Sequence, residues 1–176
     1  MVLLCMGSAQ MQFDAVVEAH SADIYRYAYW LCWDAAVAED LVQETFLRAW
    51  KSLHKLKDVK AVKAWLITIL RREFLRAKEK YRLELTGDFD LAEMAHDRGE
   101  YDTSTEAFVL RRALTELDEA YREPLMLQVL MGHSTKEIAE ILDLTQATVL
   151  TRLFRARKQM RALLEGEESR PLEEVK

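Results

Sequence analysis

The chain has 176 residues, 50% of them hydrophobic, which is enough for one packed domain or two small ones. Only five Gly and two Pro occur, and β-branched runs are few, so the composition indicates an all-α fold. The formal net charge of −5 is unusual for a DNA-binding protein, because such domains are often strongly basic.

The cysteine and histidine content argues against a metal site or a disulfide framework. Cys5 and Cys32 lack metal-ligand spacing and fit a reducing cytoplasm, and the His residues are scattered at positions 20, 54, 96 and 133. No apolar run approaches the roughly 20 residues of a membrane span, so no membrane insertion is expected. The first six residues are apolar but lack the basic start of a signal peptide, and Met6 and Met11 are alternative starts.

Charge is segregated along the chain, so the acidic total does not exclude basic surfaces that could bind nucleic acid. Residues 1–44 have a net charge of −6, residues 45–82 of +9, residues 83–106 of −7, residues 107–164 of +2 and residues 165–176 of −3. Two basic segments, one in 45–82 and one in 146–162, are therefore separated by an acidic stretch.

Residues 11–82 are expected to form one helical domain. The first helix has apolar residues at helical spacing from Phe13 to Leu31, and a turn near residues 33–34 leads to a second helix from about Ala38 to Leu53. Residues 54–60 are a polar, basic loop. The third helix is apolar on one face, at Val62, Trp65, Leu66, Ile69 and Leu70, and basic in its later turns.

Residues 83–106 lack sustained periodicity and contain eight acids, as an acidic flexible linker would. A second helical domain is expected over residues 107–164, followed by an acidic, frayed tail at 165–176. Within that domain Pro124 is expected in or near the first turn of a helix, where a missing N–H costs little. The linker is either a solubilising tether between the two basic segments or a run of carboxylates that imitates phosphates and occupies a cationic channel of a partner.

The strongest motif spans residues 134–162, STKEIAEILDLTQATVLTRLFRARKQMRA, and predicts a helix-turn-helix. Ser134 and Glu137 form a capping box at the start of its first helix. Asp143 interrupts the pattern and tolerates a left-handed backbone, and Thr145 caps the second helix. That helix has apolar residues on one side and five cations on the other, without an acid between residues 146 and 162.

A cationic amphipathic helix alone fits a solvated face or a protein-binding helix as well as DNA. The capped first helix, the short turn and the basic second helix together favour a DNA groove. No catalytic constellation, glycine-rich phosphate loop or metal motif is present, so the sequence indicates a binding protein, not an enzyme, with no cofactor.

Residues 38–50, AEDLVQETFLRAW, and 64–72, AWLITILRR, closely resemble region 2 of bacterial sigma factors. The helix-turn-helix, preceded by Leu114, Leu117 and the segment YREPL at 121–125, resembles their region 4. Both regions, their order and the short acidic linker resemble the extracytoplasmic function (ECF) subgroup of the sigma-70 family. The resemblance covers roughly residues 13–164.

This resemblance implies that core RNA polymerase is bound through its β′ clamp helices and β flap. The β′ contact would use polar residues of the second helix: Glu39, Asp40, Gln43 and Glu44. Their acidic face would meet a basic partner, although a solvated helix face has the same pattern. The family also implies an anti-sigma factor as a partner.

The basic loop and third helix would bind the −10 promoter element, where the strands are separated and bases unstack. The cations expected there are Lys55, Lys57, Lys60, Lys63, Arg71, Arg72 and Arg76. Many members have Asn at position 72, where this chain has Arg. Trp65 is a stacking surface for bases or, as its position on the apolar face favours, part of the core.

The helix-turn-helix would bind the −35 element in the major groove. The residues matching positions that contact bases or phosphates are Thr148, Thr151, Arg152, Arg155, Arg157 and Lys158. Leu150 replaces a polar residue of several members, so a contact is lost or becomes apolar, to a thymine methyl. Phe154 is expected to pack or to abut the DNA backbone.

The resemblance therefore implies an ECF sigma factor that binds core polymerase and directs promoter recognition and opening in the cytoplasm. Two rival functions remain open. One is a helix-turn-helix regulator that acts without polymerase, which would not need the acidic helix or the first basic segment. The other is a sigma-like decoy that titrates an anti-sigma factor. The complete sets of cations on both expected DNA-binding surfaces argue against a decoy.

Overall fold

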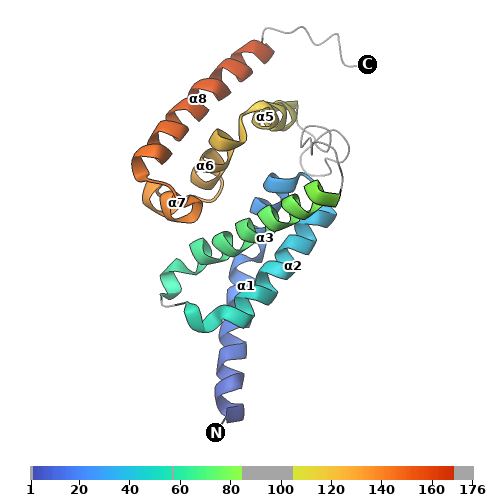
Figure 1. Cartoon of the computed structure of the whole chain (residues 1–176), viewed down its shortest axis with the longest axis vertical. Helices are drawn as coiled ribbons and strands as arrows, with labels where there is room; N and C mark the ends of the chain where they lie inside the picture. The colour runs from blue at the N-terminus through green and yellow to red at the C-terminus, as the bar shows by residue number, and fades with distance from the viewer. Residues whose placement is uncertain (1, 57, 85–104, 169–176) are drawn as a thin grey trace. The chain divides into compact units, whose positions relative to one another are not determined.

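The computed structural model describes the backbone of residues 2–56, 58–84 and 105–168, and side chains within residues 10–56, 58–80 and 109–165 (Figure 1). These residues form helices joined by short turns and contain no strand, which confirms the all-α prediction. The chain divides into two compact units, Met1–Phe89 and Asp90–Lys176. None of the described helices is long and apolar enough to cross a bilayer.

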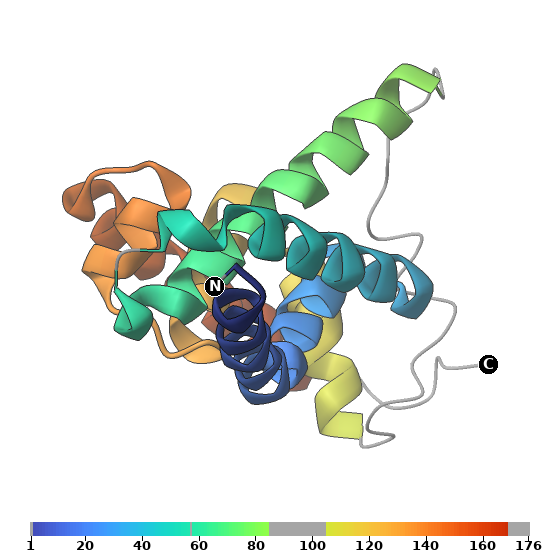
Figure 2. The ribbon, with the colours of Figure 1, turned by 90° about the horizontal axis from the view of Figure 1, so that it is seen from below.

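The first unit is built from three long helices and two single turns. They are α1 (Val2–Cys32), α2 (Ala35–Ser52), the 3-10 turns η1 (Leu53–Lys55) and η2 (Val59–Ala61), and α3 (Val62–Glu84). The three long helices pack on one another, and the first turns of α1 extend past α2 and α3 (Figure 1). The last turns of α3 extend likewise beyond the ends of α1 and α2 (Figure 2).

The α1–α2 corner explains why α2 begins three residues earlier than the sequence pattern indicated. Trp33 adopts a positive φ of 57°, which ends α1, and its N–H donates to the carbonyl of Tyr29 at 2.7 Å. Asp34 then caps α2, because its carboxylate accepts the N–H of Val37 at 2.9 Å. The expected loop over residues 54–60 contains parts of both 3-10 turns, the second of which is capped by Asp58.

The core of the first unit follows the apolar spacing of the three helices. The residues with no exposed surface include Ile24, Tyr27, Ala28, Leu66, Ile67 and Leu70. Ile67 was not among the residues expected to face inward. Trp65, which was expected to lie in the core, is only half-buried.

The second unit consists of α5 (Thr105–Glu116), α6 (Glu119–Val129), α7 (Thr135–Leu142) and α8 (Gln146–Glu168). Helix α6 packs against both α7 and α8, and α5 packs against α8. Gly132 has a φ of +72°, which only glycine adopts without strain, and it turns the chain between α6 and α7. The buried side chains include Leu117, Leu127, Ile138, Val149 and Leu153.

The position of Pro124 differs from the expected one. Asp118 caps α6 through the N–H of Ala120, so that Pro124 is the sixth residue of the helix and lies in its second turn. A proline there removes an intrahelical hydrogen bond. The ring is buried, as are the next three residues, so its packing compensates for the missing N–H.

Arg122 of α6 stabilises the corner between α5 and α6 by hydrogen bonds. Its guanidinium donates to the carbonyl oxygens of Leu117, at 2.7 and 3.2 Å, and of Thr115, at 2.9 Å. These carbonyls lie at the end of α5, where no intrahelical partner is available. Burial lowers the pKa of Arg122 from its ordinary value, although Glu119 and Asp118 oppose this shift.

Candidate nucleic-acid interface

The first helix of the helix-turn-helix is fixed by the capping box that the sequence predicted. The N–H of Ser134 donates to Glu137 Oε2 at 2.8 Å, and the N–H of Glu137 donates to Ser134 Oγ at 3.3 Å. The Ser134 hydroxyl also bonds Glu137 Oε2 at 2.7 Å. These hydrogen bonds, chiefly that of the hydroxyl, hold the pKa of Glu137 below its usual value.

The turn between α7 and α8 also has the predicted form. Asp143 is left-handed, with φ 55° and ψ 50°, and the N–H of Leu144 donates to the carbonyl of Ala139 at 2.9 Å. Thr145 caps α8, because its hydroxyl accepts the N–H of Thr148 at 3.2 Å. Helix α8 is therefore set at a fixed angle to α7.

Helix α8 has a buried side and an exposed side. Val149, Leu153, Ala156 and Met160 are buried against the rest of the unit. The rest of the surface of α8 contains every residue expected to bind the −35 element, and most of them are exposed: Thr148, Thr151, Arg152, Arg155, Arg157 and Lys158. The structure brings these six side chains onto one helix, along the surface that a DNA groove would contact.

A hollow of about 420 Å³ lies between the start of α6 and the start of α8. Its lining is mostly polar or cationic and consists of Ala120, Tyr121, Ala147, Thr148, Thr151, Arg152 and Arg155. Tyr121, which the sequence analysis placed only in a motif and not in the site, bonds Arg155 Nη1 through its hydroxyl at 3.2 Å. No local sequence signal links two residues that are 34 positions apart.

Two apolar side chains lie on the exposed side of α8. Leu150 and Phe154 are 57% and 69% exposed, so of the two alternatives expected for Phe154 its exposure contradicts packing within the protein and leaves contact with the DNA backbone. They lie four positions apart and therefore on the same face. This face offers apolar contacts beside the cations, which suits thymine methyl groups or sugar carbons.

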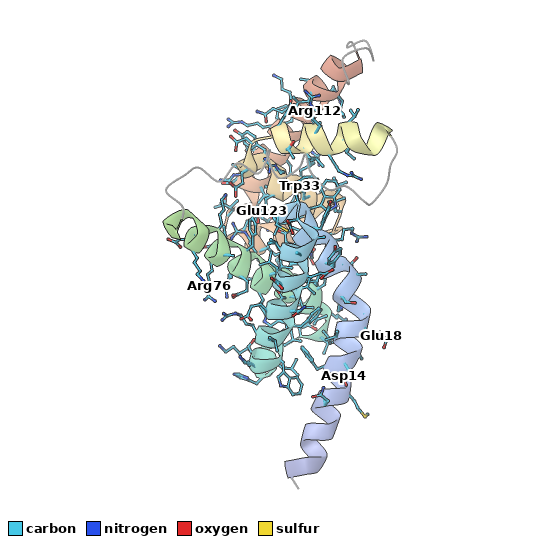
Figure 3. The ribbon with its side chains drawn as sticks, turned by 90° about the vertical axis from the view of Figure 1, so that its right-hand side faces the viewer. Asp14, Glu18, Trp33, Arg76, Arg112 and Glu123 are labelled. Carbon is cyan, nitrogen blue, oxygen red and sulfur yellow. The ribbon has the colours of Figure 1, made fainter. Side chains whose placement is uncertain are left out.

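The first basic segment lies on the η1–η2 turns and on α3. Lys55, Lys60 and Arg72 are exposed, Arg71 is half-buried, and Lys57 lies outside the described residues. Two further expected cations are held by carboxylates: Lys63 Nζ lies 2.7 Å from Asp23 Oδ2, and Arg76 Nη1 lies 2.9 Å from Glu73 Oε1. Figure 3 shows Arg76 on α3. The hydrogen bond from Lys63 is the main cause of the lowered pKa of Asp23.

The acidic residues of α2 lie on its outer face. Glu39, Asp40 and Gln43 are exposed, and Glu44 is half-buried. Arg48 Nε lies 2.7 Å from Glu44 Oε1 and 2.8 Å from Glu73 Oε2 on α3. A row of alternating charges therefore runs from Glu44 through Arg48 and Glu73 to Arg76, across the α2–α3 contact.

An apolar groove of about 600 Å³ lies between α1 and α2, beside Gln43, and the sequence analysis missed it. Its apolar lining is Phe13, Val17, Phe46, Leu47 and Trp50, with the Phe13 and Trp50 rings 5.1 Å apart. Asp14 and Glu18 of α1 line it too (Figure 3). Leu47 and Trp50 lie four and seven positions after Gln43, so an apolar stripe adjoining the polar face was the available signal.

Two family models match this chain in separate segments. Sigma-70 region 2 matches residues 16–83, and sigma-70 region 4 matches residues 107–160. The chain is 32% identical to the ECF RNA polymerase sigma factor SigM of Bacillus subtilis over 156 residues, 87% of this chain and 95% of the relative. The chain belongs to the ECF subgroup of the sigma-70 family. It is also 31% identical to SigL of Mycobacterium tuberculosis, over 86% of this chain and 88% of the relative.

Two solved structures share this fold. The sigma factor RpoE from Bartonella quintana, in complex with the anti-sigma factor NepR, is 28% identical and has a TM-score of 0.74 over 88% of this chain and 97% of that one. CnrH, in complex with the cytosolic domain of CnrY, is 26% identical with a TM-score of 0.65 over 94% and 97%. Among the described residues, no group of three or more His, Cys, Asp or Glu is placed to hold a metal ion.

Proposed function

We propose that this ECF sigma factor binds core RNA polymerase, directs it to −10 and −35 promoter elements, and helps to open the duplex. It performs no bond chemistry itself and acts in the cytoplasm. The main support is the presence in one chain of regions 2 and 4, in the order found in the family, with a capped helix-turn-helix in the second. In this proposal residues 11–82 bind the −10 element, residues 107–164 bind the −35 element, and residues 83–106 link them.

The polymerase-binding surface is the outer face of α2. Glu39, Asp40, Gln43 and Glu44 provide polar contacts for the β′ clamp helices, and the exposed positions of the first three support this role. The apolar groove beside Gln43 extends the surface, because Leu47 is 54% exposed and Trp50 is 38% exposed. Exposed apolar residues beside carboxylates suit a partner helix that is both apolar and basic.

The −10 surface is formed by the η1–η2 turns and α3. Lys55, Lys60 and Arg72 are available to phosphate, whereas Lys63 and Arg76 must first exchange their carboxylate partners for it. Half-buried Trp65 has its side chain partly accessible to an unstacked base. Lys57 is assigned to this surface from the sequence alone.

The −35 surface is the exposed side of α8. Arg155, in the hollow with Thr148 and Thr151, is assigned to a base edge, and Lys158 to phosphate. The similar sigma factor RpoE is in complex with the anti-sigma factor NepR, which supports a similar protein partner here.

Transcription in vitro with core polymerase tests the function directly. Core enzyme, the full chain and sheared genomic DNA of the source bacterium are combined, and the 5′ ends of the transcripts are mapped. We expect new start sites that depend on the chain and share two sequence elements upstream. A matched variant with Arg152, Arg155 and Lys158 changed to Ala provides the control, because it removes −35 contacts and leaves α2 unchanged.

The rival functions give different results in the same experiment. A regulator that acts without polymerase would bind DNA fragments but would not co-purify with core enzyme or create start sites. A decoy would bind an anti-sigma factor without producing transcripts. Either result would overturn the proposed function.

A further inference from the structure

Two arginines on the −35 surface are held by side chains of the neighbouring helix α6. Arg155 Nη1 donates to Tyr121 Oη at 3.2 Å, and Arg157 Nη2 donates to Gln128 Oε1. Tyr121 and Gln128 lie seven positions apart, which places them on the same face of α6, two turns apart. Between the two arginines lies Ala156, which has no exposed surface.

The side chains of Arg155 and Arg157 therefore extend in different directions from the contact between α6 and α8. Residues two positions apart in an α-helix point to nearly opposite sides of it. Arg155 and Arg157 therefore lie on either side of the buried Ala156. One reaches toward the beginning of α6 and the other toward its end. By contrast, Arg152 and Lys158 have no hydrogen-bond acceptor among the described residues, so this support is selective within α8.

Helix α6, which contains Tyr121 and Gln128, is itself held in place by its neighbours. Tyr121 precedes Arg122, whose guanidinium makes three hydrogen bonds to carbonyl oxygens at the end of α5. Leu125, Met126 and Leu127 of α6 are buried. A hydroxyl on such a fixed helix can hold a long, rotamer-rich side chain in one orientation before DNA arrives, which removes part of the ordering cost of binding.

We propose that Tyr121 and Gln128 are positioning residues that set the orientations of the Arg155 and Arg157 guanidiniums for −35 DNA. Residues of α6 thereby contribute to sequence preference. This inference rests on the proposed function. A guanidinium has five N–H donors in a rigid fork, so an acceptor for one of them turns the rest toward a defined direction. Tyr121 and Arg155 also line the same hollow, so a DNA group that enters it meets both.

The test replaces Tyr121 with Phe, which keeps the ring and the charge and removes only the hydroxyl. Holoenzyme is assembled from core polymerase and the full chain. Its affinity is measured for a transcribed promoter and for all single-base variants of the −35 element. We expect Tyr121→Phe to reduce discrimination at the base contacted by Arg155 by about three- to tenfold, the range of an ordinary hydrogen bond, because the Tyr121–Arg155 bond is exposed to solvent. The salt slope stays unchanged, because no charge is lost.

A double-mutant cycle separates positioning from a general effect on structure. In an Arg155→Ala background, Tyr121→Phe is expected to have no further effect on −35 preference. Tyr29→Phe in the first unit is the matched control and leaves preference unchanged. Gln128→Met, paired with Arg157→Ala, repeats the cycle at the other end of α6 and decides the matter if Tyr121→Phe does not fold.

Parental preference in both Tyr121→Phe and Gln128→Met would overturn the inference, and so would equal losses with and without Arg155. Holoenzyme that still starts transcription normally in those cases leaves the proposed function intact. If the parental chain directs no transcription at all, the proposed function fails instead.

Discussion

Replacing Arg48 with Met should destabilise the first unit by more than an exposed ion pair can explain. Met keeps most of the apolar stem and removes the guanidinium, whose Nε lies 2.7 Å from Glu44 Oε1 and 2.8 Å from Glu73 Oε2. The two partners differ in burial, because the Glu44 side chain is 44% exposed and that of Glu73 only 9%.

The magnitude follows from this difference. An exposed pair at i, i+4 contributes about 0.3–0.5 kcal/mol. A hydrogen bond to a charged group contributes about 1.5–3 kcal/mol when buried. Arg48 is 44% exposed and Glu73 keeps Arg76 as a second partner, so screening by solvent reduces this contribution to about 0.7–1.5 kcal/mol. The expected total is about 1–2 kcal/mol.

Urea unfolding monitored by tryptophan fluorescence measures this loss in the first unit alone. The four Trp residues all lie in the first unit, at positions 30, 33, 50 and 65. With an m-value of about 1 kcal/mol/M, the midpoint should fall by about 1–2 M. Glu44→Gln removes only the exposed pair and should shift it by less than about 0.5 M. Equal shifts in the two variants would refute the assignment of the larger effect to Glu73.

Three further predictions concern the binding surfaces and pH. Replacing both Gln43 and Glu44 with Ala should weaken binding to core polymerase with little change in helical content, and unchanged affinity for core enzyme would count against the α2 surface. Arg155→Ala should reduce the free energy of binding to promoter DNA by about 1–3 kcal/mol, by an amount that depends on the −35 sequence. Lys158→Ala should weaken binding to all promoters alike and lower the salt slope by about one. A loss that is the same for every −35 sequence in Arg155→Ala would show that Arg155 contacts phosphate. The lowered pKa of Asp23 stabilises the fold above its unfolded value of about 3.8, and this stabilisation is lost as pH falls through the lower folded value. The stability difference between the parental chain and Lys63→Met should therefore be present at pH 7 and shrink below about pH 4, and a pH-independent difference would show that the Asp23–Lys63 pair does not cause it.

The features that could be predicted from the sequence are local ones. The Ser134–Glu137 capping box and the left-handed Asp143 depend on residues within one or two turns, and the chemistry of those residues determines the geometry. The same is true of the apolar spacing that defines the long helices. For the site, this locality was enough to place the residues proposed to bind the −35 element together on α8, because a single helix fixes their relative positions.

The remaining features depend on contacts between helices. Arg48 and Glu73, or Arg155 and Tyr121, meet only once the helices are packed, and charge pattern alone does not select such pairs. Pro124 was misplaced because the helix start was assigned close to it, whereas Asp118 provides the cap six residues earlier. The groove was missed because Leu47 and Trp50 lie outside the buried stripe that periodicity detects.

The internal pairing of cations explains how an acidic chain can contact DNA selectively. In the first unit, Lys63 is paired with Asp23 and Arg76 with Glu73 before any DNA is present. Phosphate must displace a carboxylate already at 2.7–2.9 Å, so each exchange yields less free energy than binding by a free cation would. We therefore expect non-specific attraction to DNA to be weak, and the net charge of −5 to weaken it further. In the proposed −10 complex, we expect contacts through Lys63 and Arg76 to be favourable mainly where strand opening brings phosphates and bases to the surface together.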